Sequence, residues 1–518
     1  MTNQPKSSGL ARRQFLAATT AAAGAVVVTG GPLLNPPRAN ATLAGAAGRT
    51  VTALIHATVI DIDTGRRLRD HTVLLSGDRI TAVGREVRIP RGARVIDLTG
   101  KYVVPGLADM HAHALSTERV DLPLHLANGV TTIRIMSGNA MVYDWRDRVD
   151  AGSLTGPRMV VGSQIVDGDP TLWDPNLLPA VVVTDEASAR DAVRRLKDEG
   201  ADFIKVYSRV SPVAHRAILD EARRLGLTVA GHAPDAVPVT TVSDLGQRSL
   251  EHLHGVAWAV SSREREVRRL VEAIRVQTGD YNSWFRQIHA PEWLAANTFS
   301  PARASAVFAT LKANRTRVVP TLTMHRVLDM PDTALPDPSL LRYQSADTTG
   351  TFDWVLENLY KANRPADEIA HQQQMWEYRQ QFAGELFRVG VPVLAGTDTG
   401  TPYSVPGFAL HEELALLVQS GATPLQALQA ATREPARFLG QQAGKVAAGK
   451  LADLVVLAAD PLADIRNTRR IDSVIAAGRL IDSAERLRML ADVEAAVQEP
   501  GQATAAVGCC GGRPSTHK

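Results

Sequence analysis

The sequence predicts an α/β protein in which a (β/α)8 barrel (TIM barrel) carries a small β-sandwich domain built from both ends of the chain. Three observations predict this fold class. The chain has 518 residues, whereas a barrel alone takes roughly 250. Apolar strand-like runs alternate with helix-like stretches through the middle of the chain. Short strands separated by turns occupy the regions on both sides of it.

The amino-acid composition limits which partners and which kinds of site this protein can have. The sequence is 45% hydrophobic and 21% charged, as in soluble globular proteins. Its net charge of +3 is nearly balanced, so we expect a small-molecule substrate as partner and no nucleic acid. Two adjacent cysteines, Cys509 and Cys510, exclude a disulfide framework and a cysteine-ligated zinc site. Their own role and the oligomeric state stay open, a homo-oligomer included.

Residues 1–41 are predicted to be a signal peptide. Arg12 and Arg13 precede an apolar run that ends at Val28, and an Ala-x-Ala cleavage pattern follows at residues 39–41. Paired arginines before Phe-Leu are typical of a twin-arginine signal. The apolar run is shorter than the roughly 20 residues that span a bilayer. We therefore expect an exported protein, periplasmic or extracellular, with no membrane attachment after cleavage.

The β-sandwich is expected from residues 51–106 together with 440–482. Strand-like runs of alternating polarity support it, at residues 53–62, 71–75, 77–84, 93–98, 450–457 and 471–480. The tail 491–518 is rich in Ala and Gly, and is expected to be helical at first and then disordered.

The barrel is expected from residues 107–439. Its eight strands are predicted at 107–111, 131–136, 159–166, 203–207, 227–231, 249–252, 318–323 and 391–395, with helices between them, for example at 185–200, 212–226 and 366–390. Two inserts, 256–317 and 324–363, are expected to cover the mouth of the barrel. Their tryptophans, which are candidates for an apolar pocket or for core packing, are Trp258, Trp284, Trp293 and Trp354.

Chemically distinctive side chains end the predicted strands. His111 and His113 lie two apart on one strand, so both can face the same side. Lys205 interrupts an apolar strand, which is costly unless the amine is paired or chemically altered. The other members of the set are His232, His252, His254 and Asp398. Each has an ordinary structural explanation, but all of them at successive strand ends predict a metal site at the barrel mouth.

Several motifs resemble those of the amidohydrolase superfamily, within it the imidazolonepropionase-like and prolidase-like group. They are Val-Pro-Gly-Leu-Ala-Asp-Met-His-Ala-His (104–113), Phe-Ile-Lys-Val (203–206), Ala-Gly-His (230–232), Ser-Leu-Glu-His (249–252), Leu-Ala-Gly-Thr-Asp (394–398) and Gly-Lys-Leu-Ala-Asp-Leu-Val-Val-Leu (449–457). The resemblance extends over residues 51–482 and implies the barrel-plus-sandwich architecture.

The resemblance also implies a two-metal centre. His111 and His113 would bind one divalent ion, His232 and His252 the second. Lys205, carboxylated by CO2, would bridge the two ions. Asp398 would contact the first metal and transfer protons. Zinc is the expected metal, although histidine ligands also suit manganese, iron or cobalt.

Three further residues are candidates for substrate binding: Tyr207, His254 and His411. Tyr207 faces the same side of its strand as Lys205. His254 could also replace His252 as the second-metal ligand. His411 has a structural role as its alternative.

The resemblance implies hydrolysis of a carbon–nitrogen amide bond in a dipeptide, an N-acyl amino acid or a cyclic amide, by a metal-bridging hydroxide. One alternative is a one-metal cyclic amidase or deaminase of the imidazolonepropionase type, which would use His111, His113, His232 and Asp398. Ester, lactone or phosphotriester hydrolysis at the same site is another. A binding or scaffold protein without activity is the alternative outside the enzymes.

Overall fold

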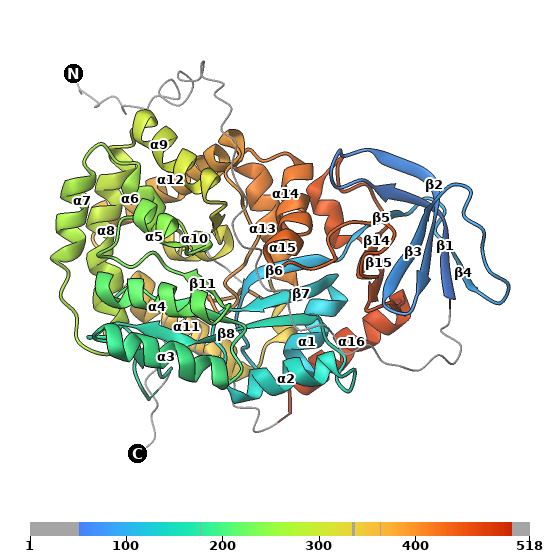
Figure 1. The fold of residues 1–518 in the computed structure, drawn as a ribbon, viewed down its shortest axis with the longest axis horizontal. Coiled ribbons are helices and arrows are strands. Elements are labelled where there is room, and N and C mark those ends of the chain that lie inside the picture. Colours follow the sequence, from blue (N-terminus) through green and yellow to red (C-terminus); the bar gives the residue numbers. More distant parts are fainter. Residues whose placement is uncertain (1–50, 177, 334–336, 363, 500–518) are drawn as a thin grey trace, which may run out of the picture.

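The computed structural model describes residues 51–176, 178–333, 337–362 and 364–499 (Figure 1). The predicted signal peptide and the two cysteines lie outside these residues. Two sheets organise the molecule. One lies at the right of Figure 1 and joins both ends of the described chain, and the other forms the barrel. Within the described chain, no helix combines the length and the apolar character needed to cross a membrane.

The first sheet is mostly antiparallel, with the order β16-β15-β14-β5-β1-β2-β3 and β4 beside β1. Its strands are β1 (Val51–Ile60), β2 (Arg67–Ser76), β3 (Arg79–Gly84), β4 (Arg94–Asp97), β5 (Tyr102–Pro105), β14 (Leu454–Leu457), β15 (Ile471–Ala476) and β16 (Arg479–Ile481). The two chain ends meet where β5 pairs with β14, with Val104 opposite Val455. A small β module formed from both ends of the chain, as the sequence predicts, is therefore present.

The second sheet is a nearly closed barrel of parallel strands in the order β13-β12-β11-β10-β8-β7-β6. The strands are β6 (Leu107–Ala112), β7 (Val130–Ile135), β8 (Arg158–Asp167), β10 (Phe203–Val206), β11 (Thr228–Gly231), β12 (Ser249–Glu251) and β13 (Arg317–Val319). The short strand β9 (Val181–Val182) pairs in parallel with the end of β8. Every residue of β6, β7, β10 and β12 is buried. Burial on both faces explains why these strands read as continuous apolar runs.

Two of the predicted strands differ from the structure. The seventh ends at Val319 instead of residue 323, and α10 (Leu322–Asp329) begins almost at once. Pro320 lacks the N–H that would continue the ladder, and Thr321 turns the chain with a φ of 47°. The eighth, 391–395, forms a single bridge from Val393 to Val318. It still closes the ring, because Leu394 N donates to Val318 O (3.0 Å) and Met110 N donates to Ala395 O (2.9 Å).

Helices cover the barrel. Those that follow successive strands are α1 (Glu118–Ala127), α2 (Ala140–Asp150), α3 (Glu186–Asp198), α4 (Pro212–Arg224), α5 (Val239–Leu245), α9 (Pro301–Ala313), α12 (Ala366–Val389) and α13 (Phe408–Gln419). The local sequence explains where two of these helices begin. Asp185 and Ser188 form a capping box for α3, and Ser211 caps α4 before Pro212. The helices predicted at 185–200, 212–226 and 366–390 are confirmed.

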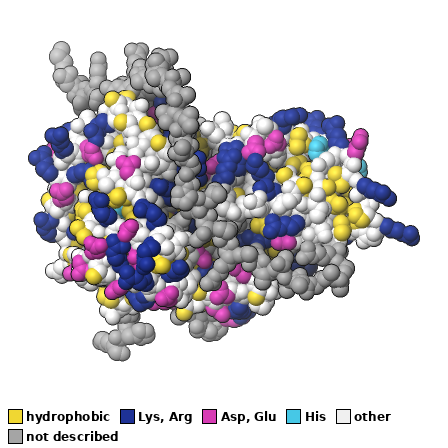
Figure 2. Space-filling view, viewed as in Figure 1, with side chains coloured by type: hydrophobic (Ala, Val, Ile, Leu, Met, Phe, Trp, Pro, Cys, Tyr) yellow, Lys and Arg dark blue, Asp and Glu magenta, His cyan; other side chains and the backbone are white. Residues whose placement is uncertain are grey.

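The two long inserts are largely helical. They contain α6 (His254–Ala259), α7 (Glu264–Glu272), α8 (Tyr281–Asn297), α10 and α11 (Ala346–Val355), which lie at the left of Figure 1. The C-terminal part adds α14 (Pro424–Ala430), α15 (Arg433–Phe438) and α16 (Ser483–Ala496). The tail predicted from residue 491 thus begins inside α16, and residues 500–518 lie outside the described residues. Charges of both signs are interspersed over the face in Figure 2, in line with the small net charge.

Candidate metal centre

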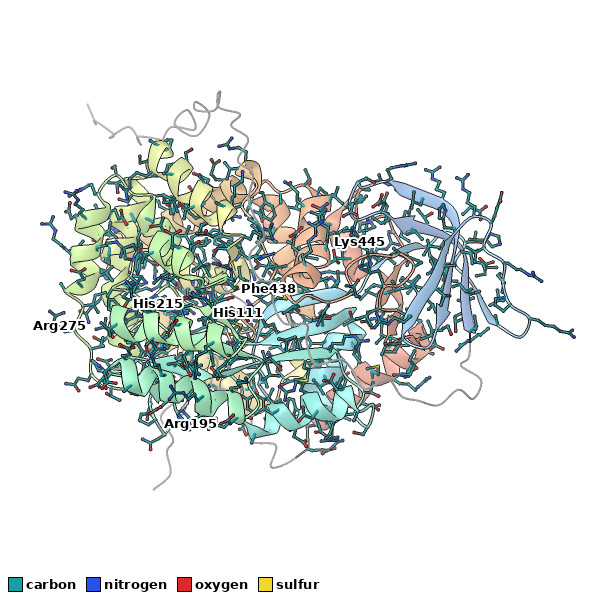
Figure 3. All side chains as sticks on the ribbon, viewed as in Figure 1. His111, Arg195, His215, Arg275, Phe438 and Lys445 are labelled. Atoms are coloured by element: carbon teal, nitrogen blue, oxygen red, sulfur yellow. The ribbon has the colours of Figure 1, made fainter. Side chains whose placement is uncertain are left out.

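Histidines from three strand ends meet inside the barrel. The ring centroids of His111 and His252 are 4.9 Å apart, those of His232 and His252 are 5.0 Å apart, and those of His111 and His113 are 5.5 Å apart. All four rings are buried, and Figure 3 shows His111 in the middle of the barrel. Residues up to 141 positions apart are thus neighbours, because parallel strands end at the same rim.

Asp398 lies beside the first two histidines. Its Oδ1 is 3.3 Å from His111 Nε2 and 3.1 Å from His113 Nε2, and one potential ligand atom from each of the three residues lies within 4.8 Å of the others. Burial alone would raise the pKa of Asp398, but His111 and His113 hold it well below its ordinary value. This carboxylate is therefore ionised, the form that binds a cation.

The histidine nitrogens fit a divalent metal. The Nε2 atoms of His111, His113 and His232 are buried and make no hydrogen bond of regular geometry among the described residues, although those of His111 and His113 lie 3.3 and 3.1 Å from Asp398 Oδ1. The opposite nitrogens of His232 and His252 are engaged, with Ser208 Oγ at 2.8 Å and Thr321 Oγ1 at 2.7 Å. An imidazole fixed through one nitrogen, with the other directed inward, is the usual arrangement of a metal ligand.

Burial also favours the ligating form of these rings. It is the main cause that lowers the pKa of His113, and it lowers the pKa values of His232 and His252 further still. The three imidazoles are therefore neutral at pH 7, and a neutral ring binds metal without first releasing a proton.

Lys205 belongs to the same cluster. It lies on β10, is 1% exposed, and its backbone N–H donates to Ser163 Oγ at 3.0 Å. After burial, the positive charge of Lys205 is the next cause that lowers the pKa of His232. The backbone geometry agrees: Lys205 is paired with Ala230 on the neighbouring strand β11, and His232 N, directly after β11, donates to Val206 O at 3.1 Å.

Arg134 and Glu251 support the cluster, and the sequence analysis did not identify them as site residues. Glu251 Oε2 is 2.9 Å from His111 Nδ1. Arg134 Nη2 donates to both Glu251 oxygens at 2.9 Å, and its Nε donates to Met110 O at 2.6 Å. Burial would raise the pKa of Glu251, but Arg134 and then His111 hold it far below its ordinary value. The Leu-Glu-His motif contained this glutamate, and an ionisable residue next to a ligand was the available signal.

A second group of polar residues adjoins the histidines. His254 begins α6, and its ring centroid lies 6.0 Å from that of His252 and 6.5 Å from that of His232. Its Nδ1 pairs with Glu292 on α8. His325, on α10, lies 5.4 Å from His254. Sequence analysis missed His325 because it falls inside an insert with no strand end to mark it.

Aromatic rings form a continuous chain of contacts from His232 to His254. The ring centroid of Tyr207 lies 4.0 Å from that of His232. From Tyr207 the contacts continue through the rings of Trp173, Tyr281 and Trp284. The ring centroid of Trp284 lies 6.3 Å from that of His254. Of the four insert tryptophans, Trp258 and Trp284 are in this apolar cluster and Trp354 packs against it. Trp293 instead stacks on His371 at 4.2 Å. An apolar wall therefore adjoins the candidate metal centre.

The contacts of His411 favour the structural alternative over substrate binding. It lies on α13 and is buried. Its Nδ1 is 3.0 Å from Thr468 Oγ1 in η3 (Ile465–Arg469), and its Nε2 is 3.0 Å from Asn128 O. Both nitrogens are engaged by the protein, so the ring fastens α13 to η3 and to the end of α1.

Comparison with known proteins agrees with this architecture. Residues 372–481 match the model of the amidohydrolase family. The chain is similar in structure to a bottromycin amidohydrolase (24% identity, TM-score 0.67, covering 86% of this chain and 91% of that one). It is also similar to a "putative prolidase" from Bifidobacterium longum (27% identity, TM-score 0.59, covering 86% of this chain and 99% of that one). A third similar structure is an A. niger ochratoxinase (19% identity, TM-score 0.61, covering 85% of this chain and 97% of that one). The search of curated proteins gave no match. The family match and the shared architecture confirm the resemblance of this chain to the amidohydrolase superfamily.

Proposed function

We propose that this protein is a metal-dependent hydrolase that cleaves a carbon–nitrogen amide bond in a dipeptide, an N-acyl amino acid or a cyclic amide. The observation that carries the proposal is the buried group of His111, His113 and Asp398, whose potential ligand atoms lie within 4.8 Å of one another, with the unbonded Nε2 of His232 also buried. The structural neighbours named as an amidohydrolase, a prolidase and an ochratoxinase support an amide substrate.

In this proposal His111, His113 and Asp398 hold one metal, and His232 and His252 hold the second. Lys205, carboxylated by CO2, would supply an anionic oxygen ligand to both. Carboxylation would turn a buried cation into an anionic oxygen ligand and so remove the cost of burying its charge. Zinc is the metal that we expect. Bound divalent ions would lower the pKa of water and polarise the amide carbonyl.

The chain's own residues supply the proton transfers and the orientation. Asp398, ionised and buried, would accept the proton of the attacking water and deliver it to the leaving nitrogen. Glu251 holds the His111 ring through Nδ1, so that Nε2 stays directed at Asp398. The aromatic chain from Tyr207 to Trp284 would exclude water and contact an apolar part of the substrate.

Metal content tests the proposal. Protein purified without a metal-binding tag should hold two equivalents per chain, and Lys205→Ala should lose about one equivalent and nearly all amide hydrolysis, because the bridge is gone. Lys197→Ala, on the exposed face of α3, is the matched control and should keep both metals.

Other results decide among the alternatives. An unchanged Lys205→Ala variant contradicts the two-metal site. One equivalent in the wild type favours the one-metal cyclic amidase or deaminase, and none favours a binding protein. Esters, lactones and phosphotriesters assayed alongside the amides test whether another bond is the preferred one.

Export through the twin-arginine route is proposed from residues 1–41 alone. Replacing Arg12 and Arg13 by lysine together should keep the protein in the cytoplasm, because the paired arginines are what a twin-arginine signal presents. Cell fractionation measures this. Export of the double variant at the wild-type level would contradict the assignment.

A further inference from the structure

His325 is a buried histidine whose hydrogen-bonding capacity is unused. Its side chain is inaccessible to solvent, and neither Nδ1 nor Nε2 has a hydrogen-bond partner among the described residues. Leaving a buried polar group without a hydrogen bond destabilises the folded protein. A ring that meets this cost at the edge of a candidate active site is a candidate for contact with a ligand.

The turn that positions His252 also positions His325. Thr321 Oγ1 bonds His252 Nδ1 at 2.7 Å, and His325 N donates to Thr321 O at 3.1 Å in the first turn of α10. The ring of His325 lies 6.2 Å from that of His252 and 5.4 Å from that of His254. The short segment after β13 therefore brings an unsatisfied imidazole next to the metal-binding histidines.

A buried ion-pair network fixes this placement. Asp329, one turn after His325 on α10, accepts from Arg379 Nε on α12 at 2.6 Å. Arg379 Nη2 donates to Glu292 on α8 at 2.9 Å, and Glu292 in turn pairs with His254 on α6. Buried ion pairs contribute little net stability, but they can specify geometry. The network links three helices of the inserts, α6, α8 and α10, to the barrel helix α12, and so connects the helix of His254 to the helix of His325.

We propose, building on the function proposed above, that His325 is a substrate-binding residue that donates a hydrogen bond to an acceptor oxygen of the amide substrate, with His254 on the adjoining side. An imidazole carries at least one N–H in every protonation state, so its ligand must offer an acceptor. The oxygen belongs either to the amide carbonyl or to a carboxylate of the substrate. His325 is outside the His111, His113 and Asp398 group that has metal-binding geometry.

Three substitutions test the assignment. His325→Phe keeps a ring and removes both nitrogens. His325→Asn keeps a polar atom near the position of Nδ1, and His325→Gln keeps one near that of Nε2. His125→Phe is the control, because His125 is buried on α1 and its Nδ1 also has no partner among the described residues. For each variant we would measure metal content, Tm, and kcat/KM for N-acetyl-L-phenylalanine and for N-acetyl-L-phenylalaninamide.

We expect His325→Phe to lower kcat/KM about 10- to 100-fold, as for loss of a hydrogen bond of roughly 1.5–3 kcal/mol. Metal content should be unchanged, and Tm should be unchanged or higher, since no protein hydrogen bond is lost. One of the Asn and Gln variants should recover part of the activity and so identify the donating nitrogen. Equal losses on both compounds indicate the amide carbonyl, whereas a loss confined to the acid indicates the carboxylate.

Wild-type kcat/KM in His325→Phe overturns the inference, and so does loss of metal, which would make His325 a ligand. If the wild type itself hydrolyses neither compound, the proposed function fails for this substrate class and binding is the test. In protein labelled with 15N-histidine, the cross-peak that is missing from His325→Phe should shift when N-acetyl-L-phenylalanine is added. No shift overturns the inference.

Discussion

At the scale of single residues, Glu251 joins the buried Arg134 guanidinium to the ring of His111. Each member depends on the others: the arginine needs an anion, and the histidine needs a partner that fixes its orientation. Metal ligands are commonly held this way by a carboxylate outside the ligand set.

Glu251→Gln should weaken metal binding about 10- to 100-fold, because the neutral amide orients His111 less firmly and leaves Arg134 without a counter-charge. Competition with a chelator measures the affinity. Glu221→Gln is the matched control, since Glu221 is a buried carboxylate that pairs with Arg194 and Arg224 on the outer surface. If the Glu251→Gln and Glu221→Gln variants bound metal equally well, the proposal that Glu251 orients His111 would be contradicted.

Two site residues also have unusual backbone conformations. Asp398 has a φ of 56° and His252 a φ of 64°, values that non-glycine residues rarely adopt. The Asp398 conformation is held by a hydrogen bond from its N–H to His111 O at 2.7 Å. Strain of this kind, sustained by surrounding contacts, is concentrated at functional sites.

At the scale of elements, the start of α10 is the junction on which the site depends. Glu413 of α13 accepts from Thr323 N at 2.8 Å, and Thr323 Oγ1 donates to Thr397 O at 2.8 Å, next to Asp398. Burial raises the pKa of Glu413 to about 8. This helix end is therefore capped by a carboxyl group that is protonated at neutral pH.

Glu413→Gln should change how stability depends on pH. The folded wild type keeps its proton up to about pH 8, whereas the unfolded chain releases it near 4.5. The free energy of unfolding of the wild type therefore falls as pH rises between these values. The glutamine variant lacks this loss, so its stability relative to wild type should increase by about 3–5 kcal/mol at most from pH 4.5 to 8. Denaturant unfolding at pH 5, 6.5 and 8 measures the difference, and a constant difference would contradict the raised pKa.

At the scale of the whole molecule, the sheet and the barrel are joined at the end of the barrel away from the site. Arg158 at the start of β8 donates to Asp453 Oδ2 at 2.8 Å. Asp453 Oδ1 accepts from Ala477 N, and Asp453 O accepts from Gly106 N. One residue before β14 thus connects strands from three parts of the chain.

Asp453→Ala should lower stability by about 2–3 kcal/mol, because Arg158 and the Ala477 N–H would lose a buried partner. Metal content and kcat should not change, since the strands begin here and end at the site. Thermal unfolding and metal analysis check both statements. Asp472→Ala removes the more exposed pair with Lys101 and should cost less than about 1 kcal/mol. Loss of metal in Asp453→Ala would show that the junction also shapes the site.

Much of this molecule could be predicted from its sequence, because apolar periodicity marks the parallel strands and residues at successive strand ends must meet at one rim. This reasoning made candidates of His111, His113, Lys205, His232, His252 and Asp398 without knowledge of any distance, and the structure brings the four histidines and Asp398 close together. Composition and local pattern also predicted the helices α3, α4 and α12, whose caps and breaks lie within a few residues of them.

The tertiary structure alone decided what depends on contacts between distant segments. The segment 391–395 closes the barrel through bonds to β13 and β6 instead of through a regular strand of its own. Arg134 pairs with Glu251, which is 117 positions away in the sequence. Arg379 pairs with Glu292 and with Asp329, which are 87 and 50 positions away. His325 and His411 look alike in the sequence, yet one ring is left without a partner among the described residues and the other has two. The difference arises because hydrogen bonding of a buried side chain is set by the neighbours that packing supplies, and no local pattern encodes those neighbours.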